Sequence, residues 1–381
     1  MTLKHKTIIL ISSESWGKIF ISKHNYAIAL AKRGNKVFFL NPIDTSLRPG
    51  EVKMTDSGVH PDLKVVTFRP FFPLALKFHL RPVFSLLIKW NIKVILRKLR
   101  IKPDIVWDFN WSYLYNDLSI FGAPLKIFNP VDQLAADACR KKADLVISIS
   151  DDILEQYSLE NVPKLRLNHG LGEVFALAAE KESPLRAKGN IQVGYVGNLT
   201  LDSLDRDLLL EIITGNPDVT FNLIGPLSGK GSNLGTTSDH DDIRGFVDKL
   251  QRQKNVILHG IKAQHEVPEL LESYDILLLC YRRTVMFKCD NSHKMIEYLS
   301  SGKVVVSTNL SAYAGNELVT MSGKDLNQQL PALFRTVAGN LDKYNSLALQ
   351  KERKAFALQN TYEGHIRKIE AFLQENHPTI N

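Results

Sequence analysis

The 381-residue sequence has few cysteines and no long apolar segment. Its three cysteines, Cys139, Cys280 and Cys289, are scattered, odd in number and outside any CxxC pair. This argues against a disulfide scaffold or a structural zinc site and indicates a reducing compartment. No stretch of about 20 apolar residues exists, so no membrane span is expected. The apolar run near the N-terminus covers only residues 8–11, unlike a signal peptide. We therefore expect a cytoplasmic protein.

Acidic residues are absent from one long segment, between Asp62 and Asp104, which holds ten lysines and arginines among large apolar side chains. This pattern is typical of a helix on an anionic membrane surface, and also of a nucleic-acid patch. The alternative is an ordinary amphipathic helix with a solvated basic face. Its core stripe would be Val83, Leu86, Leu87, Trp90 and Val94. We expect peripheral contact with an anionic membrane or this ordinary helix, and no nucleic-acid partner.

Several motifs of nucleotide and metal chemistry are also missing. No GxGxxG follows a predicted strand, which leaves a dinucleotide-dependent dehydrogenase without support. Gly225–Gly231 resembles a P-loop but lacks its spacing and the Ser or Thr after the lysine. Asp239–Asp241 fits a DxD metal pattern, but we expect it to cap a helix that starts near Asp242. The sequence therefore predicts no metal site and no cofactor.

Short β-branched runs alternate with amphipathic stretches along most of the chain, as in parallel sheets buried on both faces. Strands are predicted at 7–11, 36–40, 64–68, 104–107, 125–128, 145–148, 191–196, 220–224, 255–258, 276–280 and 304–307. Helices are predicted at 22–33, 151–157, 203–214 and along the tail from 325 to 376. The alternation predicts two Rossmann-like, doubly wound α/β domains with ligands bound at the carboxyl ends of their strands.

The alternation loosens in a polar stretch near the middle of the chain, which divides it into four parts. We expect an N-terminal domain (1–168), a linker (169–190), a C-terminal domain (191–360) and a final helix with its tail (361–381).

The most informative segment is 290–308, which predicts a polar turn, a short helix ended by Gly302 and a strand. Asn291 or Ser292 is the candidate N-cap, so backbone N–H groups and the helix dipole create an anion site. Lys294 adds a positive charge in the first turn, and Glu297 lies on the same face. Phosphates at the helix start and ribose hydroxyls at the carboxylate would match a nucleotide. The alternative is a surface Lys294–Glu297 ion pair.

Three predicted strands of the second domain end in glycine. These are Gly197, followed by Asn198, then Gly225, and Gly260, preceded by His259. Each glycine alone is compatible with a simple turn. Together they favour an edge of the sheet where a phosphate or sugar approaches the backbone closely.

In the first domain, polar residues follow three predicted strands. The segment Ser12–Gly17, with Ser13, Trp16 and Gly17, follows the first strand and is expected to face the ligand. Asp108 and Asp132 each follow a later strand. A carboxylate in that place is a candidate base or electrostatic stabiliser. Asp132 has an alternative role as the cap of a helix that starts near Gln133.

These segments together resemble a GT-B fold glycosyltransferase, in the broad family 4-like group (glycosyl transferases group 1). The stretches that carry the resemblance are VGYVGNLTLDSLDRDLLLEI, NVILHGIKAQHEVPELLESYDILLL, NSHKMIEYLSSGKVVVST and NTYEGHIRKIEAFL. The last resembles a final helix that crosses back between the two domains. Where many members carry a Glu eight residues before the ribose-binding Glu, this chain has Cys289.

The resemblance implies a hexosyltransferase-type enzyme of polysaccharide biosynthesis. It would move a sugar from a nucleotide-sugar, held by the C-terminal domain, to a glycan or lipid-linked acceptor at the N-terminal domain, without a metal. The donor would be bound by Gly197, Asn198, Arg206, Gly225, His259, Gly260, Asn291, Ser292, His293, Lys294 and Glu297. Asp132, Asp108 and Lys294 would be catalytic. The alternatives are a nucleotide-sugar epimerase of the same fold and a non-catalytic nucleotide-sugar binding protein.

Overall fold

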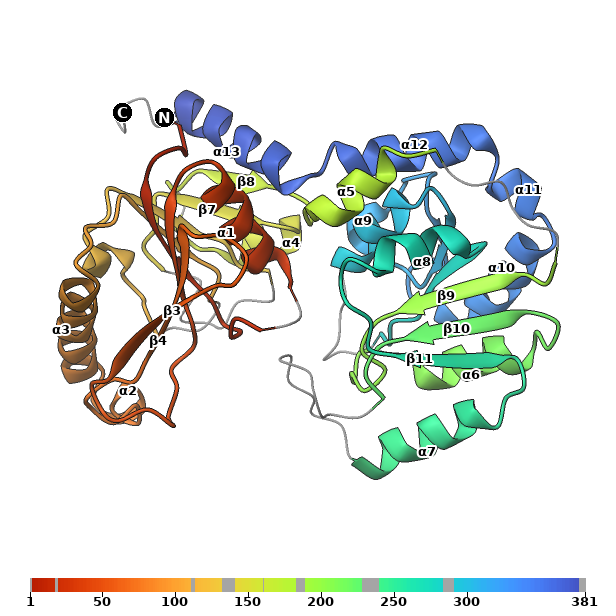
Figure 1. The fold of residues 1–381 in the computed structure, drawn as a ribbon, viewed down its shortest axis with the longest axis horizontal. Coiled ribbons are helices and arrows are strands. Elements are labelled where there is room, and N and C mark those ends of the chain that lie inside the picture. The colour runs from red at the N-terminus through yellow and green to blue at the C-terminus, as the bar shows by residue number, and fades with distance from the viewer. Residues whose placement is uncertain are drawn as a thin grey trace. The chain divides into compact units, whose positions relative to one another are not determined.

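The computed structural model describes residues 2–17, 20–110, 114–131, 141–159, 161–182, 189–227, 240–283 and 291–376. Contacts divide the chain into two units. Unit 1 comprises Met1–Asn168 with Tyr362–Asn381, and unit 2 comprises His169–Thr361. Each unit is built on its own, mostly parallel β-sheet with helices on both faces (Figure 1). The predicted fold class of two doubly wound α/β domains is confirmed.

The sheet of unit 1 has eight strands, parallel except for the edge strand β3. In spatial order they are β3 (Val52–Asp56), β4 (Leu63–Phe68), β2 (Lys36–Leu40), β1 (Thr7–Ile11), β5 (Ile105–Asp108), β6 (Leu125–Phe128), β7 (Leu145–Ser148) and β8 (Lys164–Arg166). Six of these strands were predicted to within one residue at each end. The exposed β3 and the three-residue β8 were missed because neither contains a buried apolar run.

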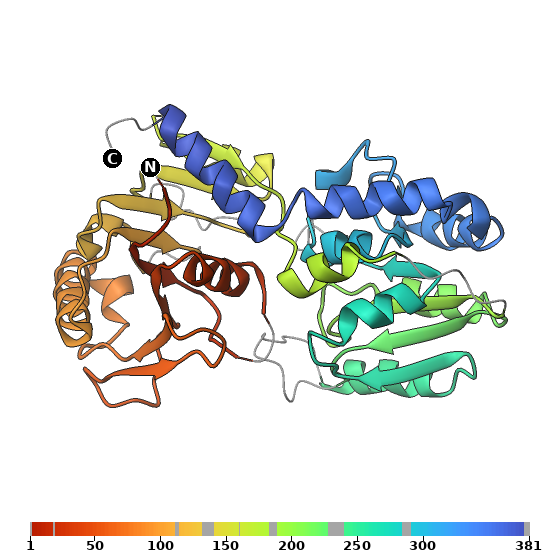
Figure 2. The same ribbon diagram turned by 45° about the horizontal axis from the view of Figure 1, so that its top comes forward.

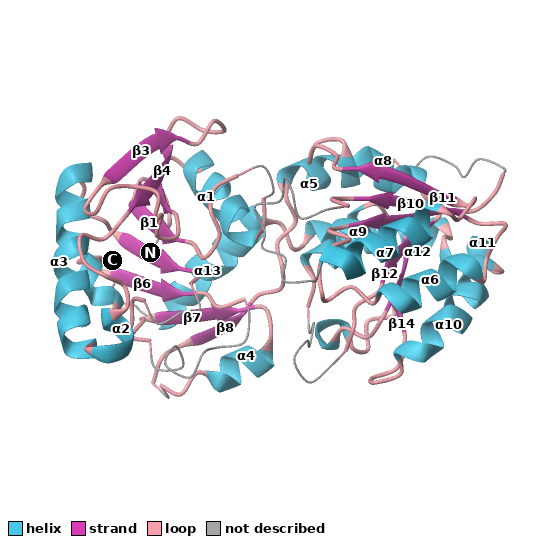
Figure 3. Cartoon of the chain, turned by 90° about the horizontal axis from the view of Figure 1, so that it is seen from below, coloured by secondary structure: helices cyan, strands magenta, loops and turns pink. Residues whose placement is uncertain are grey.

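Successive side chains of a strand point to opposite faces of its sheet, so unit 1 has two cores. Helices α1 (Ser22–Lys32) and α13 (Tyr362–Asn376) cover one face, and α3 (Arg81–Leu99) covers the other. Figure 3 shows α3 on one side of the sheet and α1 with α13 on the other. The shorter elements are α2 (Leu76–His79), η1 (Leu118–Phe121) and α4 (Asp151–Gln156).

Helix α13 follows unit 2 in the sequence but packs in unit 1. Its side chains Ile366, Ile369 and Leu373 are buried in the core beside α1. The hydroxyl of Tyr26 lies 3.1 Å from Nδ1 of His365 in the same core. The apolar face of the predicted final helix is therefore part of the first unit's core.

Helix α3 presents a different stripe to the core from the one expected of an ordinary amphipathic helix. Val83, Leu86 and Trp90 are 45%, 69% and 52% exposed. That expectation was therefore wrong for these three residues. The buried residues are Phe84, Ile88, Asn91, Ile92 and Ile95. Both sets have helical spacing, so periodicity alone could not decide between them.

The sheet of unit 2 has six parallel strands. In spatial order they are β11 (Val256–Gly260), β10 (Thr220–Ile224), β9 (Gln192–Val196), β12 (Ile276–Leu279), β13 (Val304–Ser307) and β14 (Thr320–Met321). One face packs against α6 (Arg206–Thr214), α7 (His240–Gln251) and α10 (Leu330–Ala338). The other face packs against α5 (Glu173–Ala179), α8 (Val267–Ser273), α9 (His293–Ser300) and α12 (Leu347–Leu358), as Figures 1 and 2 show.

Part of the segment expected to be a linker is helical. Helix α5 buries Phe175 in a core of unit 2. The polar composition that suggested a linker belongs to the residues after this helix. Among the helices that the structure describes, none is long and apolar enough to cross a membrane.

Candidate functional site

Three glycines meet where neighbouring strands of unit 2 end. Gly197 follows β9, Gly225 follows β10, and Gly260 is the last residue of β11. Backbone hydrogen bonds connect them in series. The N–H of Gly197 donates to the carbonyl of Ile224 at 2.8 Å, and the N–H of Gly225 donates to the carbonyl of Gly260 at 2.8 Å. The structure thus brings the strand-end glycines to one edge of the sheet.

A side chain at either of two of these glycines would meet a neighbouring group closely. A Cβ on Gly225 would lie 1.9 Å from the carbonyl oxygen of Gly197, and Gly225 has a φ of +147°. A Cβ on Gly197 would lie 2.0 Å from Nζ of Lys294. Glycine is therefore required at Gly225 by conformation and by contact. At Gly197 it allows the ammonium of Lys294 to lie directly against the backbone.

Lys294 reaches this edge from the first turn of α9. Its side chain is buried, with Nζ 5.1 Å from the ring centroid of Tyr195 and 5.7 Å from that of Tyr281. Ser292 is the N-cap residue, but its hydroxyl lies 2.6 Å from the Tyr281 hydroxyl and does not cap the helix. The ammonium and the positive end of the helix dipole meet at the same place. This combination favours an anion.

Glu297 lies one turn further along α9 and is half-buried. Burial raises the pKa of its carboxyl to about 8, although the charge of Lys294 opposes the shift. No salt bridge joins Glu297 to Lys294, so the expected alternative of a surface ion pair was wrong. Within the described part of the chain, this carboxylate has no hydrogen-bond partner. A partly desolvated carboxyl in that state can donate one hydrogen bond to a ligand when it is protonated, and it accepts hydrogen bonds in both forms.

Three tyrosines that sequence reasoning missed fix this arrangement. The buried hydroxyl of Tyr298 accepts a hydrogen bond from the N–H of Val196 at 2.7 Å, which ties α9 to the end of β9. The rings of Tyr195 and Tyr281 flank the Lys294 ammonium, a favourable cation–π geometry. Aromatic residues at such spacing usually indicate core packing, so the sequence held no distinctive signal for them.

His259 lies at the outer end of the same edge. Its Nε2 is 2.9 Å from Oδ1 of Asn222, whose Nδ2 donates to Oε1 of Gln192 at 3.0 Å. Gln192 in turn donates to the carbonyl of Asn190 at 3.3 Å, so the network assigns the proton of His259 to Nε2. Burial and then the charge of Lys262 lower the pKa of His259. The ring is therefore neutral at pH 7, with Nδ1 as a hydrogen-bond acceptor.

Asn198 and Arg206 shape the loop that follows β9. Oδ1 of Asn198 accepts from the N–H and the hydroxyl of Thr200, at 2.9 and 2.7 Å. The guanidinium of Arg206 donates to two carbonyl oxygens of this loop and forms a 2.9 Å salt bridge with Asp242. These contacts direct Arg206 toward its own loop and α7. Lys294 is therefore the better-placed cation for a phosphate.

Two further predicted residues lie at the start of α9. The ring centroid of His293 lies 6.0 Å from that of His169. Asn291, which precedes the helix, is buried. Burial lowers the pKa of His293 to about 4, with a smaller contribution from Lys294. A neutral imidazole can donate or accept a hydrogen bond here, while Lys294 supplies the positive charge.

The predicted acceptor-side residues lie in the loop after β1 of unit 1. The Ser13 hydroxyl donates to Glu14 at 2.7 Å and accepts from Nζ of Lys23 at 2.9 Å. Lys23 also forms a salt bridge with Glu14, and its side chain is 1% exposed. Nε1 of Trp16 donates to the carbonyl of Ser57 at 3.0 Å, and Gly17 is half-buried next to it. The buried cation Lys23 was not predicted.

Asp108 lies at the carboxyl end of β5 and is fully buried. It forms a 2.7 Å salt bridge with the equally buried Lys141 and accepts from the N–H of Asn110 at 2.8 Å. Burial raises the pKa of Asp108, and Lys141 opposes the shift. With no exposed surface, Asp108 is placed to hold Lys141 rather than to contact a substrate. The second predicted carboxylate, Asp132, lies outside the described residues.

The described residues contain no group of three or more His, Cys, Asp or Glu side chains that could hold a metal ion. Of the DxD-like pattern, Asp239 lies outside those ranges, and Asp241 is in the first turn of α7. The residue before this helix is Asp239, so the expected capping role stays a prediction.

Comparison with known sequences finds no matching family model. One curated protein of Bacillus subtilis (strain 168) is 26% identical over 197 residues, which span 50% of this chain and 44% of that protein. Its name is "Putative teichuronic acid biosynthesis glycosyltransferase TuaH". The chain thus matches less than half of this relative's length.

Comparison with solved structures covers nearly the whole chain. HepE of Anabaena, in complex with UDP and glucose, superposes with a TM-score of 0.66 at 15% identity, over 97% of this chain and 100% of HepE. Sucrose-phosphate synthase of Thermosynechococcus elongatus superposes with a TM-score of 0.65 at 14% identity, over 97% and 98% of the two chains. These similarities establish that the chain has the GT-B fold.

Because Glu297 is partly desolvated, its charge should reduce stability. The carboxyl is protonated in the folded state up to about pH 8 but ionised in the unfolded state from about pH 4.5. Stability should therefore fall as pH rises between these values. Glu297→Gln removes this pH dependence. The variant's free energy of unfolding should therefore exceed that of the wild type by roughly 1–3 kcal/mol more at pH 8 than at pH 5. Urea unfolding at both pH values measures it, with Glu211→Gln at an exposed site of α6 as control. A gain that is equal at the two pH values would contradict the burial of this charge.

Proposed function

We propose that the chain is a hexosyltransferase-type glycosyltransferase that takes a sugar from a nucleoside-diphosphate sugar and needs no metal. The observation that carries the proposal is the pairing of two groups on α9. The ammonium of Lys294 lies against the backbone of Gly197, and the carboxylate of Glu297 lies one turn away without a partner among the described residues. A diphosphate needs the first group and the hydroxyls of a ribose suit the second.

The comparisons support this choice of ligand. HepE has been crystallised with UDP and with UDP-glucose, and a further protein of the same fold, 13% identical to this chain, has been solved with UDP-2-fluoro glucose bound. The name of TuaH refers to teichuronic acid biosynthesis. We propose by analogy that this chain builds a polysaccharide and uses a glycan or lipid-linked acceptor.

The proposed chemistry assigns the leaving group to α9. As the bond between sugar and diphosphate breaks, negative charge grows on the departing diphosphate. Lys294 and the helix N-terminus stabilise that charge, which is the task a divalent metal performs in other enzymes. The neutral His259, whose Nδ1 is a hydrogen-bond acceptor, is assigned to bind the nucleobase of the donor. Asp132 remains the proposed base for the acceptor hydroxyl.

Glu297→Ala should weaken binding of the nucleoside diphosphate without unfolding the protein. The assigned hydrogen bonds join the Glu297 carboxyl to ribose hydroxyls. A hydrogen bond to the ionised group is worth roughly 1.5–3 kcal/mol, so affinity measured above pH 8, where this carboxyl is ionised, should fall about tenfold to a hundredfold. Calorimetry with UDP measures the change, with Glu211→Ala as the exposed control. Unchanged affinity in a folded variant would remove Glu297 from the nucleotide site.

Lys294→Ala should lower turnover more than it lowers affinity for the nucleoside alone. The charge that it faces is largest in the transition state, so kcat should fall together with kcat/KM. Product analysis with a UDP-sugar, with and without an acceptor, measures transfer. Near-normal kcat/KM in the variant would place the phosphate site elsewhere. An epimerised sugar formed without any acceptor would replace the transferase with the epimerase.

We also propose that unit 1 rests on the inner face of an anionic membrane through the outer face of α3. The argument is the exposure of Leu86 and Trp90, at 69% and 52%, beside the exposed cations Lys89 and Lys93. The ring of Trp90 makes a T-shaped contact with the ring of Phe71, and the two ring centroids are 4.4 Å apart. Apolar side chains between cations are what an anionic lipid surface binds. A lipid-linked acceptor would then be within reach.

Vesicle sedimentation should show the chain bound to anionic vesicles at low salt and released at high salt, because the attraction is screened. Lys89→Gln/Lys93→Gln should weaken this binding on the order of tenfold, since each cation contributes about 1 kcal/mol. The control is Lys4→Gln/Lys36→Gln, which removes the same charge from two exposed sites of unit 1. Equal sedimentation with neutral and anionic vesicles, or equal loss in both variants, would overturn the proposal.

A further inference from the structure

A row of hydrogen-bonded side chains crosses three neighbouring strands of unit 2 and ends at His259. Gln192 is the first residue of β9, Asn222 is the middle residue of β10, and His259 is the last residue but one of β11. The amide of Asn222 uses both of its ends. Its Nδ2 donates to Oε1 of Gln192 at 3.0 Å, and its Oδ1 lies 2.9 Å from Nε2 of His259. Asn222 is only 5% exposed, so it can act on a ligand only through a neighbour.

The backbone at the start of this row sets the direction of each hydrogen bond in it. The carbonyl oxygen of Asn190 can only accept, and Nε2 of Gln192 donates to it at 3.3 Å. Gln192 therefore turns its oxygen to Asn222, and Asn222 turns its oxygen to His259. The histidine nitrogen that faces this oxygen carries the proton. Because a neutral imidazole has one N–H, Nδ1 keeps a lone pair.

Nδ1 of His259 is the atom of the row that a ligand can use. The ring is half-buried, and among the described residues none forms a hydrogen bond with Nδ1. Directly after the ring, Gly260 turns the chain with a φ of +67°, and the side chain of Ile261 is 54% exposed. An acceptor atom beside exposed apolar surface suits a flat ring with polar groups on its edge, such as a nucleobase.

A lone pair at Nδ1 distinguishes the two common pyrimidine bases. The ring nitrogen N3 of uracil carries a hydrogen and can donate it to Nδ1, whereas N3 of cytosine carries a lone pair. Cytosine in the same place would set two acceptors against each other and leave Nδ1 without a donor. Such a mismatch lowers affinity on the order of tenfold to a hundredfold relative to the hydrogen-bonded base.

We propose that Asn222, held by Gln192, is a positioning residue that fixes the proton of His259 on Nε2, and that the nucleotide site thereby selects uracil over cytosine. The proposal rests on the proposed function, in which His259 binds the nucleobase of the donor. It adds the identity of that base and the two amides that determine it. Neither amide needs to touch the nucleotide.

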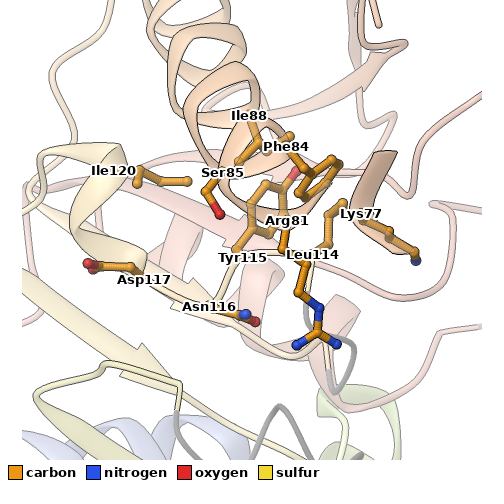
Figure 4. Close-up of a pocket in the computed structure, with 10 residues that line it drawn as sticks. All are labelled: Lys77, Arg81, Phe84, Ser85, Ile88, Leu114, Tyr115, Asn116, Asp117 and Ile120. Carbon is orange, nitrogen blue, oxygen red and sulfur yellow. The ribbon is translucent and has the colours of Figure 1, made fainter. Parts of the chain in front are cut away.

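The test needs one nucleotide site per chain, and a cavity in unit 1 does not supply a second one. Figure 4 shows this cavity beside α3, where Arg81, Phe84 and Asp117 are among the lining residues. Its volume is about 170 Å³, whereas sites that enclose a drug-sized ligand usually measure roughly 300–1,000 Å³. Titration of the full chain with a nucleotide should therefore show a single site.

Calorimetry of the full chain with UDP and with CDP tests the proposal. The wild type should bind UDP on the order of tenfold to a hundredfold more tightly than CDP. In Asn222→Ala the ring can carry its proton on Nδ1, which then donates to N3 of cytosine. UDP affinity should fall, CDP affinity should rise, and their ratio should shrink to about threefold or less. Gln192→Ala, in which the Asn222 amide can rotate, should shift the ratio in the same direction and serves if Asn222→Ala does not fold.

The control is Asn255→Ala, which removes another amide of unit 2. Nδ2 of Asn255 donates to three backbone carbonyls, those of Ile213, Asn216 and Val219. This variant should lose stability but keep the UDP/CDP ratio, because structural damage affects both nucleotides alike. Nitrogen-15 NMR of the wild type without nucleotide should show the proton of His259 on Nε2, with the signal identified by its loss in His259→Gln.

A UDP/CDP ratio near one in the wild type, an unchanged ratio in both Asn222→Ala and Gln192→Ala, or a proton on Nδ1 of His259 would overturn the proposal. The proposed function is judged by other results. It stands if UDP binds and Glu297→Ala weakens that binding, whatever the preference between bases. No binding of UDP by the wild type would overturn both.

Discussion

The position of Lys294 against the backbone of Gly197 is the constraint on which the candidate site depends. A Cβ at Gly197 would displace the Lys294 ammonium from this contact, and the adjoining turn excludes a Cβ at Gly225. A buried ammonium is costly without compensation. Here two tyrosine rings offset part of that cost by cation–π contact, and the hydroxyl of Tyr298 holds the helix to the strand. The ammonium also lies in the first turn of α9, at the positive end of the helix dipole, which is why this edge favours a phosphate.

The sequence predicted the fold well because parallel strands buried on both faces leave short, continuous apolar runs. The eleven predicted strands all exist, with ends shifted by no more than two residues. The missed strands β3, β8 and β14 are short or exposed, so no such run marks them. The face of α3 was predicted wrongly for a different reason. A helix with apolar residues on two stripes has no single period that identifies its buried side.

Features of the candidate site that lie within one segment could be predicted, whereas those that join distant segments could not. Lys294, Glu297 and the strand-end glycines each stand in a recognisable local pattern. Asp108 pairs with Lys141, 33 residues away, and Arg206 pairs with Asp242, 36 residues away. No local sequence pattern predicts either pair. In each pair, a residue predicted to act on the substrate or donor instead forms a salt bridge within the protein.

Charge in unit 1 is distributed in two different ways, and the contrast supports a second contact surface. Inside, Asp108 is neutralised by Lys141 and Glu14 by Lys23, as expected of buried charge. Outside, the cations of α3 have no acidic residues near them in sequence, and they stand beside exposed Leu86 and Trp90. Scattered exposed apolar residues are ordinary, but apolar residues interleaved with cations of one sign on one helix face are complementary to a surface that is itself both anionic and apolar.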